Sequence, residues 1–490
     1  MVFSSHIFVY YFLPIALALY YALYRAPQRW RNLSLVFLGY IFYGWANPKF
    51  IFLMFGTTFV DWLMSLVIAH SSWRFWRDWK GDVVPLEKGP RTQVQRGAIV
   101  VSVISNLTML GFFKYFNFSV ATYNAMMDAM GLGAWQWDTF FRVILPLGIS
   151  FYTFQSLSYI IDVYRGDAKA MRNFVDFSCF VSMFPHLVAG PILKFSYLAD
   201  QLEHRTLTLD KFARGVTFFA LGMAKKVLIA NPCGKIADLA FNAGSVHTGD
   251  AWLGVFGYSF QIYFDFSGYS DMAIGLGLML GFIFARNFDR PYISQSITEF
   301  WRRWHISLST WLREYLYIPL GGNRKGKIRT YVNLFLTMLL GGLWHGASWN
   351  FVIWGGIHGS ALAFERRLGK KSPYEVFPKA VRIILTYGII LFTWVFFRAK
   401  DLPAAVTYVG SMLGLGSVHE GASVMAGVLY QPYYIICFVL AGLWVWWGPD
   451  TWDYTQKLTW RKTVIALALM AISLIILRTQ EYNPFIYFIF

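Results

Sequence analysis

The stretch that decides the fold runs from Leu339 to Gly359 and reads LLGGLWHGASWNFVIWGGIHG. It is apolar enough to lie in a membrane, yet it contains two histidines, His345 and His358, among glycines and tryptophans. An ionisable ring at membrane depth is costly, and it usually marks a substrate path or a chemical step. Glycines beside such a ring let a second backbone or a substrate approach closely. The stretch therefore predicts a buried reaction site with His345 as its base.

Basic residues flank this stretch on both sides, which indicates that the chain enters the membrane and returns to the same face. Each arm has about 15 residues and rises about 22 Å, short of a hydrocarbon core of about 30 Å. The turn near residues 346–350 is therefore expected at membrane depth, with His345 at its tip. The spacing of His345 and His358 does not favour a shared metal ion, and no HExxH pattern is present, so no metal site is predicted.

The composition is that of a membrane protein. The chain has 490 residues, of which 57% are hydrophobic and only 14% charged, whereas a soluble domain carries about a quarter. The net charge of +17 raises the question of a nucleic acid partner. Because the basic residues cluster between apolar runs, the positive-inside bias explains them better, and no nucleic acid partner is expected. Cys179, Cys233 and Cys437 are far apart and predict neither a disulfide framework nor a cysteine-based zinc site.

Apolar runs of about 17 to 25 residues recur along the chain, as in a polytopic helical protein. Basic and basic-poor loops alternate from the start of the sequence, which places the N-terminus outside. The segment 174–193 breaks this alternation and contains Pro185 and Pro191, so we expect it to enter and leave on one face. All of residues 1–490 are expected to form a single all-α integral membrane domain in the lipid bilayer.

Charged residues lie inside two of the apolar segments. Asp265 and Asp271 occur in QIYFDFSGYSDMAIG, within the apolar segment 251–284. Either the two carboxylates have a structural hydrogen-bonding role, or they line a tunnel and orient a base or a substrate there. Lys225 and Lys226 lie near the middle of the crossing that begins at Phe212, and the sequence alone does not explain them.

The most basic region, residues 286–329, has nine Lys or Arg against three acids. Within it, a capping box at Ser296 and a stop at Pro319 predict one helix. One broad face of that helix is expected to point into the bundle, and it comprises Trp301, Trp304, His305, Leu308, Trp311, Leu312 and Tyr315. The arginines that project to the side, and that are candidates to bind an anionic donor, are Arg302, Arg303 and Arg313.

Three blocks together resemble a known family: YFDFSGYSDMAIG, ITEFWRRWHISLSTWLREYLYIPLGGNRKG and GGLWHGASWNFVIWGGIHG. The chain resembles the membrane-bound O-acyltransferases (MBOAT), in the branch that acetylates alginate and other polysaccharides, over nearly its whole length. The D-alanine transfer proteins of teichoic acid biosynthesis (DltB) are more distant. The resemblance implies about 11 transmembrane helices plus re-entrant and interfacial helices around a central tunnel.

The resemblance also implies roles for individual residues. The histidine of WHG, His345, is the catalytic one, and His305 is a second functional residue nearer the cytoplasmic side. Candidate tunnel residues are Asp265, Asp271, Trp344, Trp304 and His358.

The resemblance implies that acetyl groups, with acetyl-CoA as donor substrate and no bound cofactor, reach an exopolysaccharide across the bacterial inner membrane. A periplasmic or membrane-anchored acetyltransferase like AlgJ or AlgX is the expected partner. Alginate is the expected polymer; cellulose and peptidoglycan are alternatives.

A base in an ester transfer takes the proton of a hydroxyl, for which a neutral buried imidazole is suited. Two other classes remain open. One is a proton-coupled transporter or flippase in which His345, Asp265 and Asp271 form a relay. The other is a non-catalytic scaffold for a polysaccharide synthase.

Overall fold

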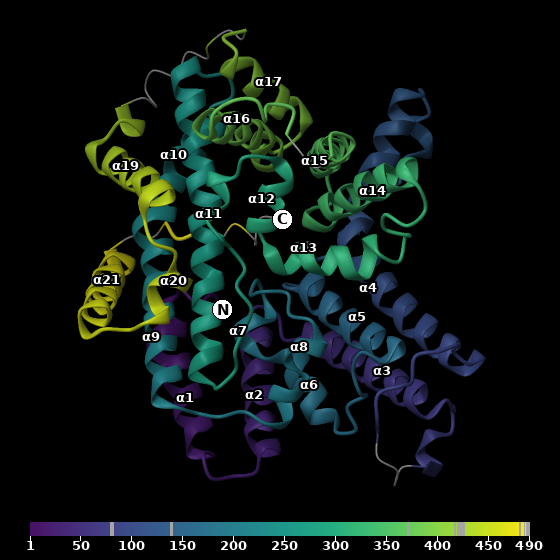
Figure 1. Cartoon of the computed structure of the whole chain (residues 1–490). Coiled ribbons are helices and arrows are strands. Elements are labelled where there is room, and N and C mark those ends of the chain that lie inside the picture. Colours follow the sequence, from purple (N-terminus) through teal and green to yellow (C-terminus); the bar gives the residue numbers. More distant parts are fainter. Residues whose placement is uncertain are drawn as a thin grey trace. The chain divides into compact units, whose positions relative to one another are not determined.

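The computed structural model describes residues 1–78, 83–137, 141–369, 372–415, 418, 427–479, 482–484 and 486. Within this part of the chain every regular element is a helix (Figure 1). The chain divides into two compact units. Unit 1 comprises residues 1, 7–208 and 280–282, and unit 2 comprises residues 2–6, 209–279 and 283–490. The predicted all-α class is confirmed.

Unit 1 packs its helices around buried polar side chains as well as apolar ones. Its elements are η1 (Phe8–Phe12), α1 (Leu13–Ala22), α2 (Gln28–Gly44), α3 (Phe50–His70), η2 (Phe75–Asp78), α4 (Gln93–Ala129), η3 (Gly133–Trp135), α5 (Ile149–Arg165), α6 (Phe174–Ser182), α7 (Phe184–Leu187) and α8 (Phe195–Glu203). In its interior the Asp61 carboxylate accepts hydrogen bonds from Ser102 and Asn106. The segment around Pro185 forms two short buried helices, α6 and α7, instead of one span.

Unit 2 contains every candidate site residue. Its elements are α9 (Leu209–Ala224), η4 (Lys225–Ala230), α10 (Asn231–Asn242), α11 (Thr248–Met279), η5 (Pro291–Ile293), α12 (Ile297–Arg303), α13 (Ile306–Leu312), η6 (Arg313–Tyr317), α14 (Lys327–His345), α15 (Trp349–Arg367), α16 (Lys379–Arg398), α17 (Leu402–Met412), α19 (Pro432–Trp447), α20 (Thr451–Gln456) and α21 (Trp460–Thr479). A large aromatic cluster from α11, α12, α15 and α16 forms its core.

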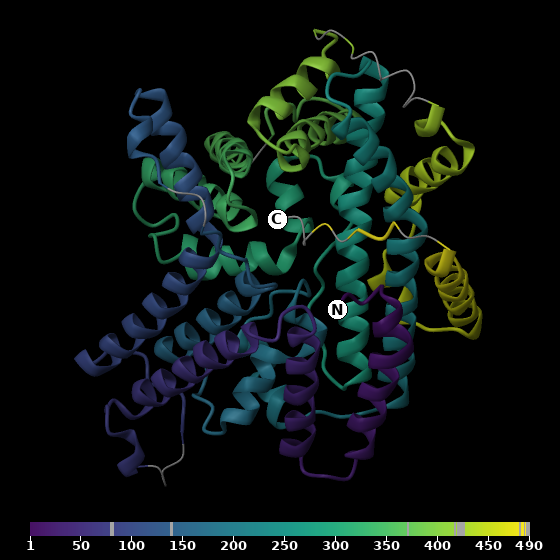
Figure 2. The same ribbon diagram turned by 180° about the vertical axis from the view of Figure 1, so that it is seen from behind.

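The long pair α9 and α11 packs closely because glycines face each other (Figures 1 and 2). A Cβ on Gly222 would lie 2.5 Å from the Gly268 carbonyl oxygen, and one on Gly275 would lie 2.5 Å from the Gly215 oxygen. Small residues at such positions let two backbones approach, which is typical of helix pairs in membranes.

Four described helices are long and apolar enough to cross a membrane: α3, α4, α16 and α21. The segments 8–22 and 432–447 are apolar but shorter. Among the apolar runs of the sequence, those near residues 6–24, 50–69, 383–397 and 433–447 are each predicted to span the membrane, and each coincides with helices of the structure. The total of about 11 spans, the sidedness of the termini and the central tunnel stay predictions.

Three sequence-based boundaries were wrong. The helix predicted from Ser296 to Pro319 is broken at Trp304 and His305, because His305 adopts a left-handed backbone conformation with φ of 44°. The arms around the turn at Gly346 each have 19 residues, not about 15, so each rises about 28 Å. The apolar run predicted as a span over residues 97–116 continues as α4 to Ala129, although the sequence predicts a loop over residues 117–141.

Candidate active site

The hairpin of α14 and α15 places His345 at its apex. Helix α14 ends at His345, Gly346 is extended, and α15 begins after Ser348, whose hydroxyl accepts a hydrogen bond from the Asn350 N–H. The Asn350 side chain in turn donates to the Ala399 carbonyl at 2.9 Å, which joins the apex to the end of α16. The predicted turn and the predicted position of His345 at the tip are confirmed.

Glycines hold the two arms of the hairpin together. A Cβ on Gly342 would lie 2.3 Å from the Phe351 carbonyl oxygen, and one on Gly355 would lie 2.5 Å from the Met338 oxygen. Both distances are below any normal contact, so neither position accommodates a side chain without movement of the backbone. The glycines that suggested a buried reaction site therefore set the separation of the arms that carry His345.

Aromatic rings surround His345. Its ring meets Trp344, Trp354 and Phe397 edge to face, at centroid distances of 5.1, 5.3 and 5.2 Å. His345 is 7% exposed, so it is buried but not fully covered. An apolar surround of this kind orients an imidazole and favours its neutral form, which a base requires.

His305 is a second histidine beside Trp344. The Trp344 ring is 6.4 Å from the His305 ring, and the His305 ring packs edge to face on Phe266 at 4.6 Å. His305 is fully buried. The structure thus brings together the two predicted catalytic histidines and one predicted tunnel residue, Trp344.

His358 is embedded in the aromatic cluster and both of its ring nitrogens are engaged. The Trp301 indole N–H donates to His358 Nδ1 at 3.2 Å, and His358 Nε2 lies 3.2 Å from the Thr393 hydroxyl oxygen. The Thr393 hydroxyl itself donates to the Ile390 carbonyl, so His358 Nε2–H is the donor to Thr393. His358 therefore joins α12, α15 and α16. Trp304, another candidate tunnel residue, packs in the same cluster and contacts Trp394 at 5.1 Å.

The two candidate aspartates form buried ion pairs. Lys225 lies 2.7 Å from Asp271, and Lys226 lies 2.8 Å from Asp265. These contacts explain the two lysines that the sequence left unexplained: they join η4 to α11. They favour the structural role that the sequence analysis kept open for both carboxylates, and they leave less support for a proton relay.

The predicted donor-binding arginines separate into two groups. Arg302 and Arg313 line a cavity of about 480 Å³ between α12, α13, η6, α14 and α15, and Arg366 of α15 lines it as well. Arg303 instead forms ion pairs with Glu299 at 2.9 Å and with Asp289 at 3.5 Å. Apolar side chains and hydroxyl groups complete the cavity wall, which comprises Thr298, Trp301, Ile306, Ser309, Thr310, Leu312, Tyr317, Leu334, Thr337, Met338 and Leu362.

Two packed tryptophan rings lie between the wall of this arginine-lined cavity and His345. Trp301 lines the cavity and packs on Trp354 at 5.6 Å, and Trp354 packs on His345. The buried Glu365 carboxylate accepts hydrogen bonds from the N–H groups of Ile297 and Thr298, both at 2.8 Å, which anchors the start of α12 on α15. Sequence reasoning missed Arg366 and Glu365, because only the pairing of α12 with α15 brings them here.

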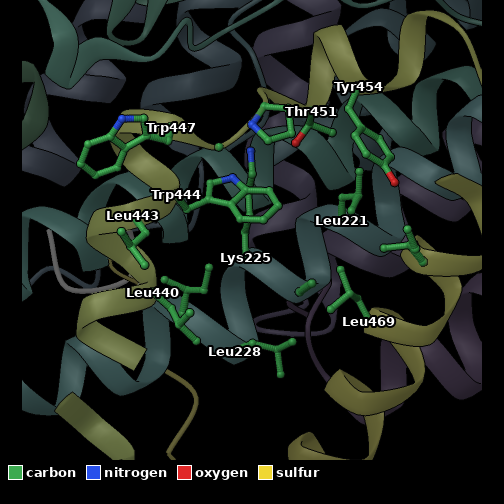
Figure 3. Close-up of a pocket in the computed structure, with 15 residues that line it drawn as sticks. Leu221, Lys225, Leu228, Leu440, Leu443, Trp444, Trp447, Thr451, Tyr454 and Leu469 are labelled. Atoms are coloured by element: carbon green, nitrogen blue, oxygen red, sulfur yellow. The ribbon is translucent and has the colours of Figure 1, made fainter. Parts of the chain in front are cut away.

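A second cavity of about 500 Å³ lies among α9, η4, α19, α20 and α21 (Figure 3). Leu440, Leu443 and Trp444 line one side of it and Leu221 and Leu469 the other (Figure 3). Its wall is almost entirely apolar, and neither candidate catalytic histidine lines it. Among the described residues, no group of three or more His, Cys, Asp or Glu side chains is arranged to hold a metal ion.

Comparison with known proteins identifies the family. Residues 167–400 match the profile of the MBOAT, membrane-bound O-acyltransferase family. The chain is 46% identical to the probable alginate O-acetylase AlgI of Pseudomonas putida, with 100% of both chains covered. It is 32% identical to the peptidoglycan O-acetyltransferase of Helicobacter pylori, over 100% of this chain and 98% of that one.

A more distant relative is the teichoic acid D-alanyltransferase of Streptococcus thermophilus, 29% identical over 51% of this chain and 68% of that one. The resemblance drawn from the sequence is thereby confirmed. With its apolar helices and its histidine at the apex of α14 and α15, the chain is a membrane protein and an acyltransferase that belongs to the membrane-bound O-acyltransferase family.

Proposed function

We propose that this enzyme takes acetyl groups from cytoplasmic acetyl-CoA and passes them across the bacterial inner membrane for O-acetylation of an exopolysaccharide, with alginate as the polymer. The observation that carries the proposal is the position of His345 at the apex of the α14–α15 hairpin, within an aromatic surround. The names of the relatives that match over their full length support acetyl transfer to a polysaccharide. Peptidoglycan and cellulose are the alternative acceptors.

The reaction is an exchange of a thioester for an ester. The oxygen of the acceptor hydroxyl forms a bond to the acetyl carbonyl carbon, and the carbon–sulfur bond of acetyl-CoA breaks. His345 takes the hydroxyl proton as the new bond forms, and the proton then passes to the departing thiolate. General base catalysis by a positioned histidine contributes about 10²- to 10⁴-fold in rate.

The arginine-lined cavity suits the donor. Coenzyme A carries phosphates at one end and a thioester at the other. Arg302, Arg313 and Arg366 offer guanidinium groups to the phosphates, while the apolar wall that ends at Trp301 receives the thioester arm. A cavity of about 480 Å³ lies within the usual range for small-molecule sites.

The protein is proposed to cross the inner membrane several times, and the acetyl group is proposed to leave on the outer side. A periplasmic or membrane-anchored polysaccharide acetyltransferase similar to AlgJ or AlgX would then complete the transfer to the polymer. The tunnel implied by the family connects the two faces in this proposal.

Replacement of His345 tests the catalytic assignment. The variant His345→Ala should reduce polymer acetylation by about 10²-fold or more, while the abundance of the protein in the membrane stays unchanged. Bound acetate on the secreted polymer and an immunoblot of the membrane fraction give the two measurements. Wild-type acetate in the variant would exclude His345 as the base.

Transfer of label from radioactive acetyl-CoA by the purified protein in detergent separates an enzyme from a transporter, because a transporter forms no new covalent bond. The donor site has a matched pair of variants in the same assay. Arg302→Ala should raise KM for acetyl-CoA about tenfold, since it removes a contact to a phosphate. Arg303 instead pairs with Glu299 and Asp289, so Arg303→Ala should change KM for acetyl-CoA less than Arg302→Ala does. Equal effects of the two would place the donor elsewhere.

A further inference from the structure

The backbone at His305 is strained. His305 has φ of 44° and ψ of 55°, a left-handed conformation that non-glycine residues seldom adopt, and it separates α12 from α13. Such a conformation is unfavourable for a residue with a Cβ and persists where the surroundings enforce it. Here the Ile306 N–H donates to the carbonyl oxygen of Asn287 at 2.9 Å. Asn287 thus holds the turn on which His305 is presented.

The side-chain oxygen of Asn287 also holds the His305 ring. Asn287 Oδ1 lies 3.2 Å from the Ser307 backbone nitrogen, 2.9 Å from the Ser307 hydroxyl and 3.1 Å from His305 Nδ1. A backbone N–H can only donate, so the Asn287 atom that faces it must be the carbonyl oxygen. The Asn287 amide group agrees with this orientation, because its Nδ2 donates to the Ser270 hydroxyl at 3.0 Å.

These contacts determine the tautomer of His305. The Ser307 hydroxyl oxygen also lies 3.4 Å from His305 Nδ1, but it is closer to Asn287 Oδ1, at 2.9 Å, and donates its hydrogen there. A carbonyl oxygen can only accept, so His305 Nδ1 carries a hydrogen and donates it to Asn287. In the neutral ring, Nε2 then has a lone pair and no hydrogen. A protonated ring would instead bury a charge and leave a second N–H to be satisfied, which is costly. His305 Nε2 is buried and has no hydrogen-bond partner among the residues that the structure describes.

We propose that Asn287 is a positioning residue for acyl transfer: it holds His305 in the Nδ1–H tautomer, so that Nε2 accepts a hydrogen bond from a second hydroxyl group of the acceptor, beside the one that His345 deprotonates. The proposal rests on the proposed function, since it needs a hydroxyl acceptor in the site. Trp344, which contacts both histidine rings, places this acceptor atom in the same aromatic site as His345. A buried acceptor without a partner is unfavourable, and an entering substrate hydroxyl satisfies it.

His358 provides an internal contrast. It is equally buried, but its Nδ1 accepts from Trp301 and its Nε2–H donates to Thr393. It therefore has the opposite tautomer, and both nitrogens are satisfied within the protein. The structure thus gives His358 a packing role and leaves His305 Nε2 as a hydrogen-bond acceptor for the substrate.

The first test measures the tautomer and needs no activity. Solid-state NMR of the protein in lipid bilayers, with histidine labelled in ¹³C and ¹⁵N, distinguishes the two neutral forms, and the spectra of His305→Gln and His358→Gln assign the two rings. We expect Nδ1–H at His305 and Nε2–H at His358. In Asn287→Leu the His305 signal should change to Nε2–H or to a mixture, with the His358 signal unchanged. An Nε2–H form at His305 in the unaltered protein would overturn the assignment.

The second test measures turnover of labelled acetyl-CoA. Asn287→Leu should lower kcat about 10²-fold or more with KM for acetyl-CoA little changed, because ring placement and tautomer act on the chemical step. Asn287→Asp keeps an acceptor for Nδ1 and for both Ser307 donors, so it should recover most of that loss. Ser307→Ala removes the hydroxyl that donates to Asn287 Oδ1, and it should lower kcat less than Asn287→Leu does.

The two variants of Asn287 keep the proposal falsifiable even if one folds poorly, because the His358 signal reports on the fold. A folded Asn287→Leu with unaltered kcat, or an Asn287→Asp as inactive as Asn287→Leu, would overturn the positioning role. If His345→Ala leaves acetylation intact while the tautomers are as expected, the proposed function fails and the hydrogen-bonding assignment stands.

Discussion

At His358, both ring nitrogens have partners on neighbouring helices, so this histidine fastens α12 and α16 to α15. The sequence could place His345, because glycines and flanking charges already predicted a turn beside it. It could not separate the roles of His305 and His358. That distinction depends on Asn287, Trp301 and Thr393, and each of these is brought to its histidine only by the tertiary fold.

His358→Gln tests this structural role. The variant should lower the free energy of unfolding by about 1–3 kcal/mol, because it leaves either the Trp301 N–H without its acceptor or the Thr393 hydroxyl oxygen without its donor. Thermal unfolding of the detergent-solubilised protein, followed by intrinsic fluorescence, measures the loss. Thr393→Val removes one of the same two contacts and should give a smaller decrease. A kcat that falls as far as in His345→Ala, at unaltered stability, would contradict this role.

At the scale of helices, the π-helix η4 explains how two adjacent lysines reach two carboxylates on one neighbouring helix. Lys225 binds Asp271 and Lys226 binds Asp265, both on α11. A π-helical turn accommodates an extra residue within a helix and is frequent at functional sites. The sequence showed the four charges but not their pairing, since α9 and α11 are aligned by glycine contacts that no periodicity specifies.

Lys226→Met should destabilise the protein by about 3–5 kcal/mol, because it leaves the Asp265 carboxylate buried without its cation. The double variant Lys226→Met, Asp265→Asn removes both charges and should recover most of that loss. The comparison uses thermal unfolding of the purified variants in one detergent. A double variant no more stable than Lys226→Met would show that the charge itself is not the cause.

The hairpin of α14 and α15 offers adjacent glycines with opposite surroundings. Gly355→Ala should lower stability by about 1–3 kcal/mol and reduce turnover, because its Cβ would lie 2.5 Å from the Met338 carbonyl oxygen and push the arms apart. At Gly356 the nearest atoms are 3.9 Å away. Gly356→Ala is therefore the matched control and should stabilise the helix by about 0.5–1 kcal/mol. If Gly355→Ala and Gly356→Ala lost the same amount of stability and turnover, close packing of the two arms at Gly355 would not be the cause.

The break at His305 escaped prediction at this scale. Neither glycine nor proline occurs between Ser296 and Tyr317, so the pattern indicated one helix. The left-handed residue is a histidine instead, held there by Asn287. The capping residue itself was correctly predicted: the Ser296 hydroxyl accepts from the Glu299 N–H at 3.0 Å.

At the scale of the whole chain, residues 2–6 belong to unit 2, whereas residue 7 and those that follow belong to unit 1. Phe3 is fully buried and stacks on Tyr269 of α11 at 4.4 Å. Ser4 accepts a hydrogen bond from Asn483, near the other end of the sequence. The hydropathy of the sequence shows that both ends are apolar. It does not predict the contact between Ser4 and Asn483, because these residues are hundreds of positions apart.

Phe3→Ala should therefore weaken unit 2 selectively, by about 3–5 kcal/mol for the loss of a buried ring. Hydrogen–deuterium exchange with mass spectrometry should show faster exchange in peptides of α11 than in those of α3 and α5. Ile7 is 42% exposed, so Ile7→Ala serves as the control and should change neither the stability nor the exchange rates of these helices. Faster exchange in α3 and α5 alone would contradict the assignment of Phe3 to unit 2.

The sequence ends in the aromatic segment NPFIYFIF, which the alternation of basic loops predicts on the outer side; Phe485 and residues 487–490 lie outside the described part of the chain. The described residues of this end cross α10 and α11 (Figure 2). Lys226 donates to the Pro484 carbonyl, and the buried Ile486 donates its N–H to Asp265 at 3.0 Å.

This anchoring has a practical consequence for handling the protein. An affinity tag or fluorescent reporter fused after Phe490 begins only a few positions beyond a main-chain amide that is bonded to a buried carboxylate. The Asp265 carboxylate that accepts from Ile486 is also the partner of Lys226, so the activity of a C-terminal fusion should be compared with that of the untagged protein. Labels are better inserted at the exposed Gly133–Trp135 segment, where no buried residue is disturbed.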